Sequence, residues 1–423
     1  MTSEVDSKIF RAYDIRGIYP DELDESAAYK IGRAFAVYLK ENETEKPEKI
    51  FVGNDARDSS SVLKRAFMEG AADGGFNVSD IGLATVDMVY FASGRFNLPA
   101  AMITASHNPK GWNGFKLMKS GVDFFNVKDL EAIISEKRSD RSELKGEVKE
   151  ENIEGDYLNH VLSFIDIDAI RPMRIMIGAD GGVINPILKS IVEKLPIEID
   201  DNHYQFGCVF DADGDRANFT DENGEKVNPS IAGALMAKYF LKRNLYGKIV
   251  FSATASKIIS DIADIYNGEA IREKVGHTFI KKRMKEVGGI LGVETSGHYY
   301  FKNNFYADSG VISFLTMLQI LSEEKKNLSV LVSELSKYVS ISEMNFEVSD
   351  PERLIKKIAE NFEGYDLDWL DGLTARTPDF WFNLRPSNTE PLIRLNIEAK
   401  DELILNRVKD DLMKLIEKEN ASI

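Results

Sequence analysis

Three segments of the chain repeat the same order of residue types, and this repeat limits the possible folds more than any other feature. Each starts with a basic residue, continues with a short apolar run and ends in a turn of small or polar residues. These segments are residues 49–55, 174–180 and 248–254. Stretches with apolar residues at helical spacing follow them, from Ser61, Asn185 and Ser256. Such an order is typical of buried strands that lead into crossover helices, so we expect three related α/β units, although chance recurrence would give the same pattern.

The part of the chain after about Ser340 follows a different order. Apolar patterning predicts a strand, a helix, two strands and a closing helix. They cover residues 343–350, 351–362, 380–386, 392–399 and 401–419. This order predicts a smaller α+β domain with an antiparallel sheet.

A length of 423 residues suggests two to four domains rather than one. Residues 128–156 are rich in charge and poor in large apolar side chains, which predicts a surface helix and a domain joint. We expect an α/β protein of four domains with these boundaries: 1–150, 151–226, 227–340 and 341–423.

The composition excludes several classes of partner. Lys and Arg total 53 and Asp and Glu total 69, which gives a net charge of −16. This balance argues against nucleic acid and against anionic membranes, but a local basic pocket can still bind a small anionic substrate. Cys208 is the only cysteine, and the chain has neither a secretory signal nor an apolar run of about 18 residues. We therefore expect a cytoplasmic protein without disulfides.

The first motif is Thr104-Ala-Ser106-His107-Asn108-Pro109, which follows an apolar run. We expect Ser106 to lie exposed at the carboxyl end of a strand, where α/β sheets usually bind ligands. The serine could carry or accept a group, with His107 contacting an anion and Lys116 acting as base or phosphate contact. A polar turn that caps the next helix is an equally good interpretation. No G-x-S-x-G elbow is present, so acyl transfer is disfavoured.

The second motif places Asp211, Asp213 and Asp215 at alternate positions. Alternation puts the three carboxylates on one side of an extended segment, and a divalent cation such as Mg²⁺ or Ca²⁺ removes their repulsion. An EF-hand loop for Ca²⁺ would end at Glu222, but it needs Gly where Arg216 stands. An aspartyl-phosphate hydrolase would use Asp211 as nucleophile, but Asp215 does not fit its pattern. A metal clamp for a phosphate, with Arg216 beside it, is favoured over these and over a solvated acidic turn.

The third motif contains Glu294, Ser296 and His298, again at alternate positions. We expect the three side chains to share one face, where they suit the recognition of sugar hydroxyls by hydrogen bonds. A polar hairpin edge is the alternative. The Gly276-His277 pair forms a similar tight turn before a basic helix.

The fourth motif starts at Arg385 and continues with Ser387, Asn388 and Thr389 in a turn between two prolines. A guanidinium, small donors and main-chain N–H groups in such a turn predict a phosphate-binding loop. A hydrophilic turn between two strands is the alternative.

The fifth motif, near the start of the chain, contains Arg11, Tyr13 and Arg16. The two arginines could meet an anion. Spacing alone favours a first strand with an exposed salt bridge.

Together, the five segments resemble the α-D-phosphohexomutase family, in its phosphomannomutase/phosphoglucomutase branch. The matching stretches are FRAYDIRG, TASHNP, DADGDR, GVETSGH and RPSNTEP, and they span the chain in this order. The resemblance implies four domains around a central cleft, the first three being related α/β units.

The resemblance also implies a mechanism. Ser106 would be a phosphoserine that donates and recovers a phosphoryl group. Asp211, Asp213 and Asp215 would hold Mg²⁺ together with one oxygen of that phosphate. The groups around the reacting phosphoryl group would be Arg16, His107 and Lys116, and acid/base work would fall to Lys116 or His298.

Substrate contacts are implied as well. A hexose phosphate would be bound by Arg11, Tyr13, Arg216, Gly276, His277, Glu294, Ser296, His298, Arg385, Ser387, Asn388 and Thr389. The implied reaction interconverts hexose 6- and 1-phosphates of mannose or glucose through a sugar 1,6-bisphosphate, which also serves as activator. We expect a monomer or a small homo-oligomer.

Two alternatives to this reaction remain open, a phosphoglucosamine mutase and a silent sugar-phosphate-binding protein. Thr254 stands where some bacterial members have a sugar-binding Lys. The sequence therefore leaves the preferred sugar undecided.

Overall fold

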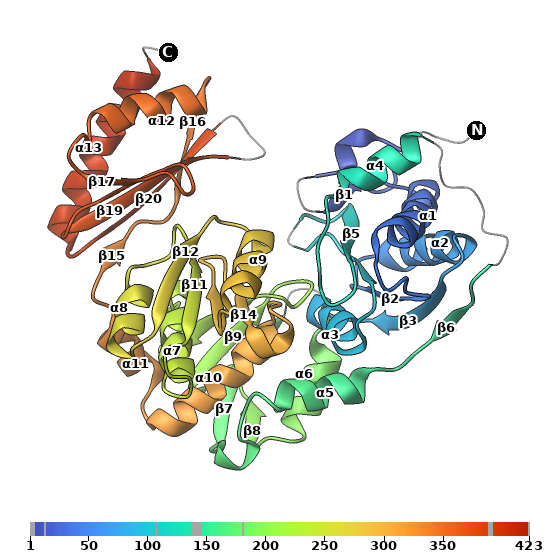
Figure 1. The fold of residues 1–423 in the computed structure, drawn as a ribbon. Coiled ribbons are helices and arrows are strands. Elements are labelled where there is room, and N and C mark those ends of the chain that lie inside the picture. Colours follow the sequence, from blue (N-terminus) through green and yellow to red (C-terminus); the bar gives the residue numbers. More distant parts are fainter. Residues whose placement is uncertain are drawn as a thin grey trace. The chain divides into compact units, whose positions relative to one another are not determined.

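The structure is a computed structural model that describes residues 5–11, 14–106, 108–136, 145–179, 182–387 and 392–421. Its contacts divide the chain into two units. Figure 1 shows the helices and strands, coloured along the sequence. The first unit consists of Met1–Lys226 and His298–Lys325, and the second of Val227–Gly297 and Lys326–Ile423. Each unit thus contains two separate stretches of the chain.

The first unit begins with a six-stranded mixed sheet. Its strands β4, β2, β3 and β6 are parallel, whereas β5 runs antiparallel between β4 and β1. The antiparallel β5 brings the chain back along β4. In sheet order the strands are β1 (Ile15–Ile18), β5 (Trp112–Met118), β4 (Ala100–Ile103), β2 (Lys49–Asn54), β3 (Asn77–Leu83) and β6 (Val148–Glu150).

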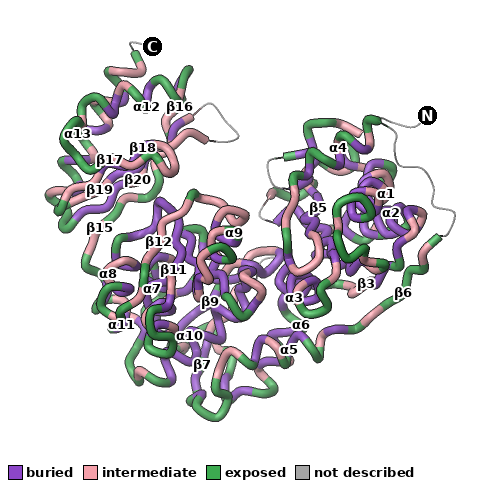
Figure 2. The backbone as a smooth tube through the Cα atoms, in the orientation of Figure 1, coloured by how far each residue is buried: buried purple, intermediate pink, exposed green. Residues whose placement is uncertain are grey.

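Helices cover both faces of this sheet. Ile50 and Val52 belong to the same core cluster as Phe67 of α2, whereas Phe51 points the other way and contacts Phe96 of α3, with ring centroids 5.2 Å apart. Strands buried on both faces read as continuous apolar runs, which is why residues 49–55 lack alternation. In Figure 2, buried and exposed stretches alternate along α1 and α2, and β6 at the edge of the sheet is exposed. The helices are α1 (Glu25–Asn42), α2 (Ser60–Asp73) and α4 (Lys128–Ser135) on one face and α3 (Val86–Phe96) on the other.

A second sheet of four strands completes the first unit. Strand β7 pairs in parallel with β8 and β9, and β10 pairs antiparallel with β9. Phe314 of α10 contacts Phe206 and Phe210 of β9. The chain therefore supplies part of this core from a segment about a hundred residues further on. The strands are β10 (Ala217–Asp221), β9 (Phe206–Phe210), β7 (Met173–Ala179) and β8 (Ile197–Ile199), and the other elements are α5 (Glu154–Leu162), α6 (Asn185–Val192), β14 (Tyr299–Phe301) and α10 (Gly310–Glu324).

The second unit begins with a parallel sheet in the order β12, β11, β13. Its first helix starts at Pro229, directly after Asn228, whose side chain accepts a hydrogen bond from the Ser230 N–H. An N-cap Asn followed by Pro is a strong start signal for a helix. The elements are α7 (Pro229–Leu241), β11 (Lys248–Ser252), α8 (Ile258–Ile265), β12 (Glu269–Glu273), α9 (His277–Val287), β13 (Leu291–Val293) and α11 (Leu328–Leu335).

An antiparallel sheet forms the end of the second unit. Both β15 and β16 pair with β20, and the order continues through β19 and β18 to β17. Two helices share one apolar core with the sheet. The elements are β15 (Val339–Ser340), β16 (Met344–Glu347), α12 (Pro351–Glu360), β17 (Asp366–Asp368), β18 (Leu373–Arg376), β19 (Phe380–Pro386), β20 (Leu392–Ala399) and α13 (Glu402–Asn420).

The predicted fold class is confirmed: three α/β sheets are followed by a smaller antiparallel α+β part. Strands lie at all three repeated segments, and a helix follows each. The sequence did not predict β17 and β18, and the expected joint at 128–156 contains β6, which extends the first sheet. The four domain boundaries stay a prediction. Within the described part of the chain, no helix combines the length and apolar character needed to cross a membrane.

Candidate functional site

Ser106 lies in a turn directly after β4, as predicted, but it is not exposed. The residue is only 2% exposed and its backbone is left-handed, with a φ of 49°. Its main-chain N–H donates to Thr104 Oγ1 at 2.8 Å, which tightens the turn. The expected exposure is wrong because Arg57 packs against the turn and donates to the main-chain carbonyls of Ser106 and Asn108.

Arg57 holds the serine turn through several hydrogen bonds at once. Besides these two carbonyls, its guanidinium donates to the carbonyls of Pro109 and Trp112, both at 3.2 Å. Asp55 orients the guanidinium, with an Nε–Oδ2 distance of 3.2 Å. Sequence reasoning missed Arg57. Its position directly after β2, at the same sheet edge as the serine turn, was the available signal.

A cavity of about 730 Å³ lies next to this turn. Its volume falls in the range of small-molecule sites. Ser106 and Ala212 both line it, so the serine turn and the loop with the three aspartates border the same space. Aromatic and charged side chains contribute to its wall, including Tyr19, Arg57, Lys110 and Trp112.

Arg16, at β1, also reaches the serine turn. Its guanidinium donates to the Asn108 side chain and lies 3.4 Å from the Ala105 carbonyl oxygen. Asp14 pairs with its Nε at 2.8 Å. Arg11 is exposed, and its main-chain N–H donates to the Asp14 carbonyl. The predicted residues Tyr13 and His107 lie outside the described residues.

The three aspartates occupy the turn between the antiparallel strands β9 and β10. Asp213 and Asp215 are almost fully buried, and the Arg216 N–H donates to Asp211 Oδ1 at 3.1 Å. Residues 217–221 form β10 and pair with β9 inside the twelve residues of the EF-hand alternative, and the next helix starts only at Pro229. The EF-hand alternative is therefore wrong.

Lys116 lies on β5, next to the strand that leads into the serine turn, and contacts the aspartate loop. Its Nζ lies 2.8 Å from Asp213 Oδ2 and 2.8 Å from Asp215 Oδ2. Burial alone lowers the pKa of the Lys116 ammonium, but Asp213 and Asp215 together raise it well above its usual range. The side chain is therefore a charged donor in this arrangement. Thr104 Oγ1 lies 3.5 Å from Asp213 Oδ2, which brings the serine turn to the same carboxylate.

The donor atoms of the loop fit a divalent cation. Within the described ranges, Asp211 Oδ2, Asp213 Oδ1 and Asp215 Oδ1 are buried and make no hydrogen bond. Two of them lie in longer ion pairs, each at 3.4 Å: Asp211 Oδ2 with Arg216 and Asp215 Oδ1 with His298. One oxygen of each carboxylate can be chosen so that all three lie within 4.8 Å of one another. Burial, followed by the charges of Asp215 and Asp213, raises the pKa of Asp211 well above its usual range. A cation would remove this repulsion, and hard cations such as Mg²⁺ prefer carboxylate oxygens.

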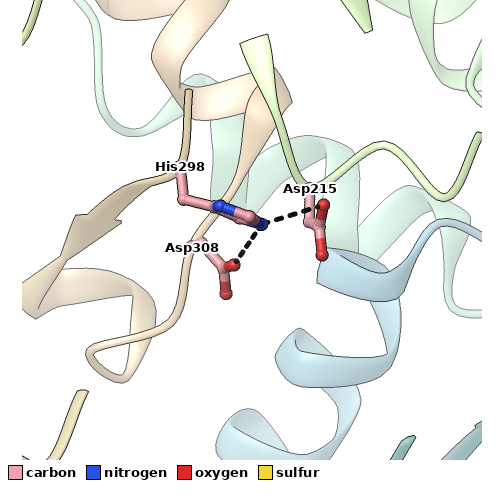
Figure 3. Close-up of side chains that lie close together, drawn as sticks. All are labelled: Asp215, His298 and Asp308. Carbon is pink, nitrogen blue, oxygen red and sulfur yellow. Dashed lines mark ion pairs between the residues drawn. The ribbon is translucent and has the colours of Figure 1, made fainter. Parts of the chain in front are cut away.

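His298 lies beside the same carboxylates, at the point where the chain re-enters the first unit. Its Nε2 is 3.4 Å from Asp215 Oδ1 and 3.7 Å from Asp308 Oδ2, as Figure 3 shows. Arg216 Nε lies 3.3 Å from the same nitrogen and 3.4 Å from Asp211 Oδ2. The imidazole is thus placed between two carboxylates and a guanidinium. Sequence reasoning missed Asp308, which no motif marked.

The expected common face of Glu294, Ser296 and His298 is wrong. Strand β13 ends at Val293, and residues 294–297 form a turn in which Glu294 is buried and Ser296 is exposed. Glu294 Oε2 accepts a hydrogen bond from the Gly276 N–H at 3.3 Å, directly before α9 starts at His277. Two predicted sugar contacts in the second unit therefore meet, although they were predicted from separate motifs.

The predicted phosphate loop begins between β19 and β20 in the second unit. Arg385 pairs across the strands with Arg394, and both guanidinium groups contact Glu343, at 3.0 Å and 2.9 Å. Burial raises the pKa of Glu343, but its contacts with Arg385, Asn396 and Arg394 outweigh this effect and lower the pKa below its usual value. The ionised carboxylate is therefore favoured. Sequence reasoning missed Arg394, which only the strand register brings beside Arg385.

The Ser387 N–H bonds to the Leu392 carbonyl across the base of this loop. Asn388 and Thr389 lie outside the described residues. The loop therefore starts and ends on paired strands.

Comparisons with known proteins match three parts of the chain to models of one family. Residues 7–143 match the family model described as phosphoglucomutase/phosphomannomutase, alpha/beta/alpha domain I. Residues 228–338 match domain III of the same description, and residues 343–415 match its C-terminal domain.

Individual relatives match over nearly the whole chain. A phosphomannomutase of Methanocaldococcus jannaschii is 34% identical over 99% of both chains. A phosphoglucomutase of Neisseria meningitidis is 31% identical over 97% of this chain and 96% of its own. A solved phosphoglucomutase/phosphomannomutase family protein of Burkholderia thailandensis has a TM-score of 0.88 and 26% identity, over 99% of this chain and 98% of its own.

Proposed function

The chain belongs to the α-D-phosphohexomutase family, and we propose that it interconverts hexose 6-phosphate and hexose 1-phosphate, with mannose or glucose as the sugar. One observation carries the proposal: the serine turn and the three-aspartate loop meet in one unit. Lys116 contacts Asp213 and Asp215, and Thr104 joins Asp213 to the backbone of Ser106. A serine beside a cation site and an ammonium group is the arrangement that phosphoryl transfer needs.

In the proposed reaction, Ser106 carries the phosphoryl group. A sugar hydroxyl oxygen forms a bond to phosphorus, the bond to Ser106 Oγ breaks, and the hydroxyl proton passes to a base, for which His298 is proposed. Mg²⁺ bound by Asp211, Asp213 and Asp215 and by a phosphoserine oxygen would draw negative charge from the phosphoryl group. Lys116, Arg16 and His107 would offset the remaining charge and hold the group in place.

The product of the first transfer is a sugar 1,6-bisphosphate, which must turn end for end so that its other phosphate returns to Ser106. This step requires recognition that tolerates two orientations of the sugar. We assign the non-reacting phosphate to Arg385 and the loop after it, with Ser387, Asn388 and Thr389. Sugar and anion contacts are assigned to Arg11, Tyr13, Arg216, Gly276, His277, Glu294, Ser296 and His298.

The remaining parts of the proposal concern organisation and compartment. We propose four domains with the boundaries 1–150, 151–226, 227–340 and 341–423, acting as a monomer or a small homo-oligomer. The buried free thiol of Cys208 suits a reducing cytoplasm. No nucleic-acid or membrane partner is proposed.

Turnover is the direct test of the substrate. Mannose 1-phosphate, glucose 1-phosphate and glucosamine 1-phosphate are compared, each with Mg²⁺ and a trace of the matching bisphosphate. We expect conversion of the first two. Conversion of the third alone would make the protein a phosphoglucosamine mutase, and inactivity with all three would refute the proposed function.

The role of the serine is tested by Ser106→Ala, with Ser135→Ala as the matched control because Ser135 is an exposed serine of α4 in the same unit. We expect the parent and the control to contain a fraction one phosphate heavier by intact mass, and Ser106→Ala to lack both this fraction and activity. Full activity of Ser106→Ala would contradict the phosphoserine mechanism.

A further inference from the structure

A buried carboxylate outside the proposed site, Asp87, connects three segments that are distant in sequence. It lies in the first turn of α3 and is 1% exposed. Its Oδ2 accepts hydrogen bonds from Ser309 Oγ at 2.6 Å and from Tyr157 OH at 2.7 Å. Its Oδ1 accepts a hydrogen bond from Thr85 Oγ1. Both oxygens are thus used as acceptors by three hydroxyl groups.

Two of these segments also hold the backbone of the aspartate loop. The Val86 N–H, next to Thr85, donates to the Asp213 carbonyl at 2.9 Å. The Gly310 N–H, next to Ser309, donates to the Gly214 carbonyl at 3.3 Å. Consecutive carbonyls of the loop are therefore fixed from two sides.

The loop also packs closely against one of these segments. Gly214 has a left-handed backbone with a φ of 77°, and a Cβ at this position would lie 2.9 Å from Thr85 Cγ2. Small movements of Thr85 therefore reach the loop directly.

We propose that Asp87 is a positioning residue for the metal site: by bridging Thr85 and Ser309, it fixes the two backbone donors that hold Asp213 and Gly214. Ser309 is also the N-cap of α10, where its Oγ accepts from the Ile312 N–H. The bridge thus fixes the start of α10 as well as the start of α3. This inference rests on the metal site of the proposed function, but it does not depend on which reaction follows.

The bridge uses both oxygens of the Asp87 carboxyl group. All three partners donate, so both oxygens must accept, and an amide in place of the carboxylate turns one acceptor into a donor. Asp87→Asn keeps the shape of the side chain and should release one side of the bridge. Residues that support metal ligands in this way typically change metal affinity by about 10–100-fold when they are altered.

The experiment measures Mg²⁺ binding to the full chain by titration calorimetry, without any sugar phosphate. We expect Asp87→Asn to weaken Mg²⁺ binding about tenfold or more. Saturating Mg²⁺ should recover most of kcat, so that the loss appears in the Mg²⁺ dependence of the rate. Because turnover is a second readout, failure of the proposed function leaves the binding result interpretable.

Two further variants separate positioning from stability and from charge. Thr85→Val removes one hydroxyl and no charge, keeps the methyl contact to Gly214, and should weaken Mg²⁺ binding in the same direction. Tyr157→Phe removes a hydrogen bond of the same carboxylate but neither backbone donor, and it should leave Mg²⁺ affinity within about twofold of the parent. If Asp87→Asn does not fold, the difference in Mg²⁺ affinity between Thr85→Val and Tyr157→Phe tests the proposal.

Three results would overturn the inference. The first is unchanged Mg²⁺ affinity in folded Asp87→Asn with only a lower melting temperature, which would make Asp87 purely structural. The second is unchanged affinity in Thr85→Val, which would assign the Asp87 effect to its charge. The third is equal weakening in Thr85→Val and Tyr157→Phe, which would reflect a general loss of packing.

Discussion

The charged side chains around the aspartate loop of the first unit and those around Arg385 of the second unit differ in burial and in the sign of their excess charge. In the first unit, Lys116 and Arg216 face the three carboxylates of the aspartate loop. In the second unit, Arg385 and Arg394 share the single carboxylate of Glu343. The first group thus has one carboxylate more than its cations, and the second has one cation more than its carboxylates.

Burial separates the central pairs of the two groups. The side chains of Asp213 and Lys116 are 0% and 9% exposed, whereas those of Glu343 and Arg394 are 29% and 30% exposed. The other arginines overlap, with Arg216 at 22% and Arg385 at 12%. Buried charges that lose a partner cost several kcal/mol, while partly exposed pairs contribute little to stability. We therefore expect the proposed cation site of the first unit to be coupled to folding, and the proposed anion site of the second unit to be coupled to ligand binding.

The largest expected effect comes from Lys116→Met. The variant leaves Asp213 and Asp215 as buried carboxylates without their ammonium, so the free energy of unfolding should fall by about 3 kcal/mol. Mg²⁺ should restore part of this loss, because a cation that binds only the folded state stabilises it. Urea unfolding with and without Mg²⁺ measures both effects.

The matched control is Lys119→Met, which removes a half-exposed lysine paired with Asp123 just after the same strand. Its loss should stay below about 1 kcal/mol and be independent of Mg²⁺. Equal losses in the two variants would break the comparison, because the buried group would then be no more important for folding than an exposed pair.

The second-largest effect is a difference between Asp87 and Glu343 in how their ionisation changes stability with pH. Burial raises the pKa of Asp87 to about 6, despite its three hydrogen bonds. The folded chain then binds this proton more tightly than the unfolded chain, so stability falls as the pH rises from about 4 to 6, by at most about 3 kcal/mol. Asp87→Asn should lack this fall.

Glu343 should behave in the opposite way, because Arg385 and its other partners lower its pKa below the usual value. Its contribution to stability is present above the unfolded pKa and is lost as the pH falls through the folded pKa. Relative to the parent, Asp87→Asn should gain stability with rising pH and Glu343→Gln should lose it. Urea unfolding from about pH 3 to pH 8 covers the ionisation of both carboxylates, and slopes of the same sign in the two variants would contradict the contrast.

Arg385→Lys should change binding and not folding. Lysine keeps the charge but loses the planar fork, so we expect KM for the hexose phosphate to rise about tenfold. The free energy of unfolding should change by less than about 1 kcal/mol. Arg376→Lys, on β18 of the same sheet, is the control, since Arg376 pairs with Asp366 and Asp368 and should leave KM unchanged. A loss of stability as large as that of Lys116→Met would show that the second group is also coupled to folding.

Local pattern was enough to predict the strand and helix of each repeated segment and five elements of the part after Ser340. Apolar runs predicted the strands β2, β7 and β11. The alternation of Asp211, Asp213 and Asp215 predicted carboxylates on one side of a segment, and their oxygens lie close together in the loop. Both signals are contained in a few consecutive residues. The same alternation failed at Glu294, because β13 ends one residue earlier and Gly297 takes a left-handed turn.

The supporting residues could not be predicted in this way. Arg57 reaches the serine turn from another strand, Asp308 reaches His298 across a hairpin, and Glu343 reaches Arg385 through the register of a sheet. Asp87 depends on contacts 70 and 222 residues away. Such partners are set by topology, and a single sequence shows no periodicity for them.

The smallest expected effect, from Glu343→Gln, sharpens the assignment of the anion site. The carboxylate of Glu343 contacts both guanidinium groups, so a substrate phosphate would compete with it for the same donors. Glutamine keeps the volume but removes the charge, and we expect KM for the hexose phosphate to fall about twofold to threefold with kcat unchanged. Glu347→Gln, an exposed change on β16, is the control and should have no effect. A higher KM in Glu343→Gln would instead mean that Glu343 orients the two arginines for the phosphate, and the excess positive charge of the second group would then be less important than its geometry.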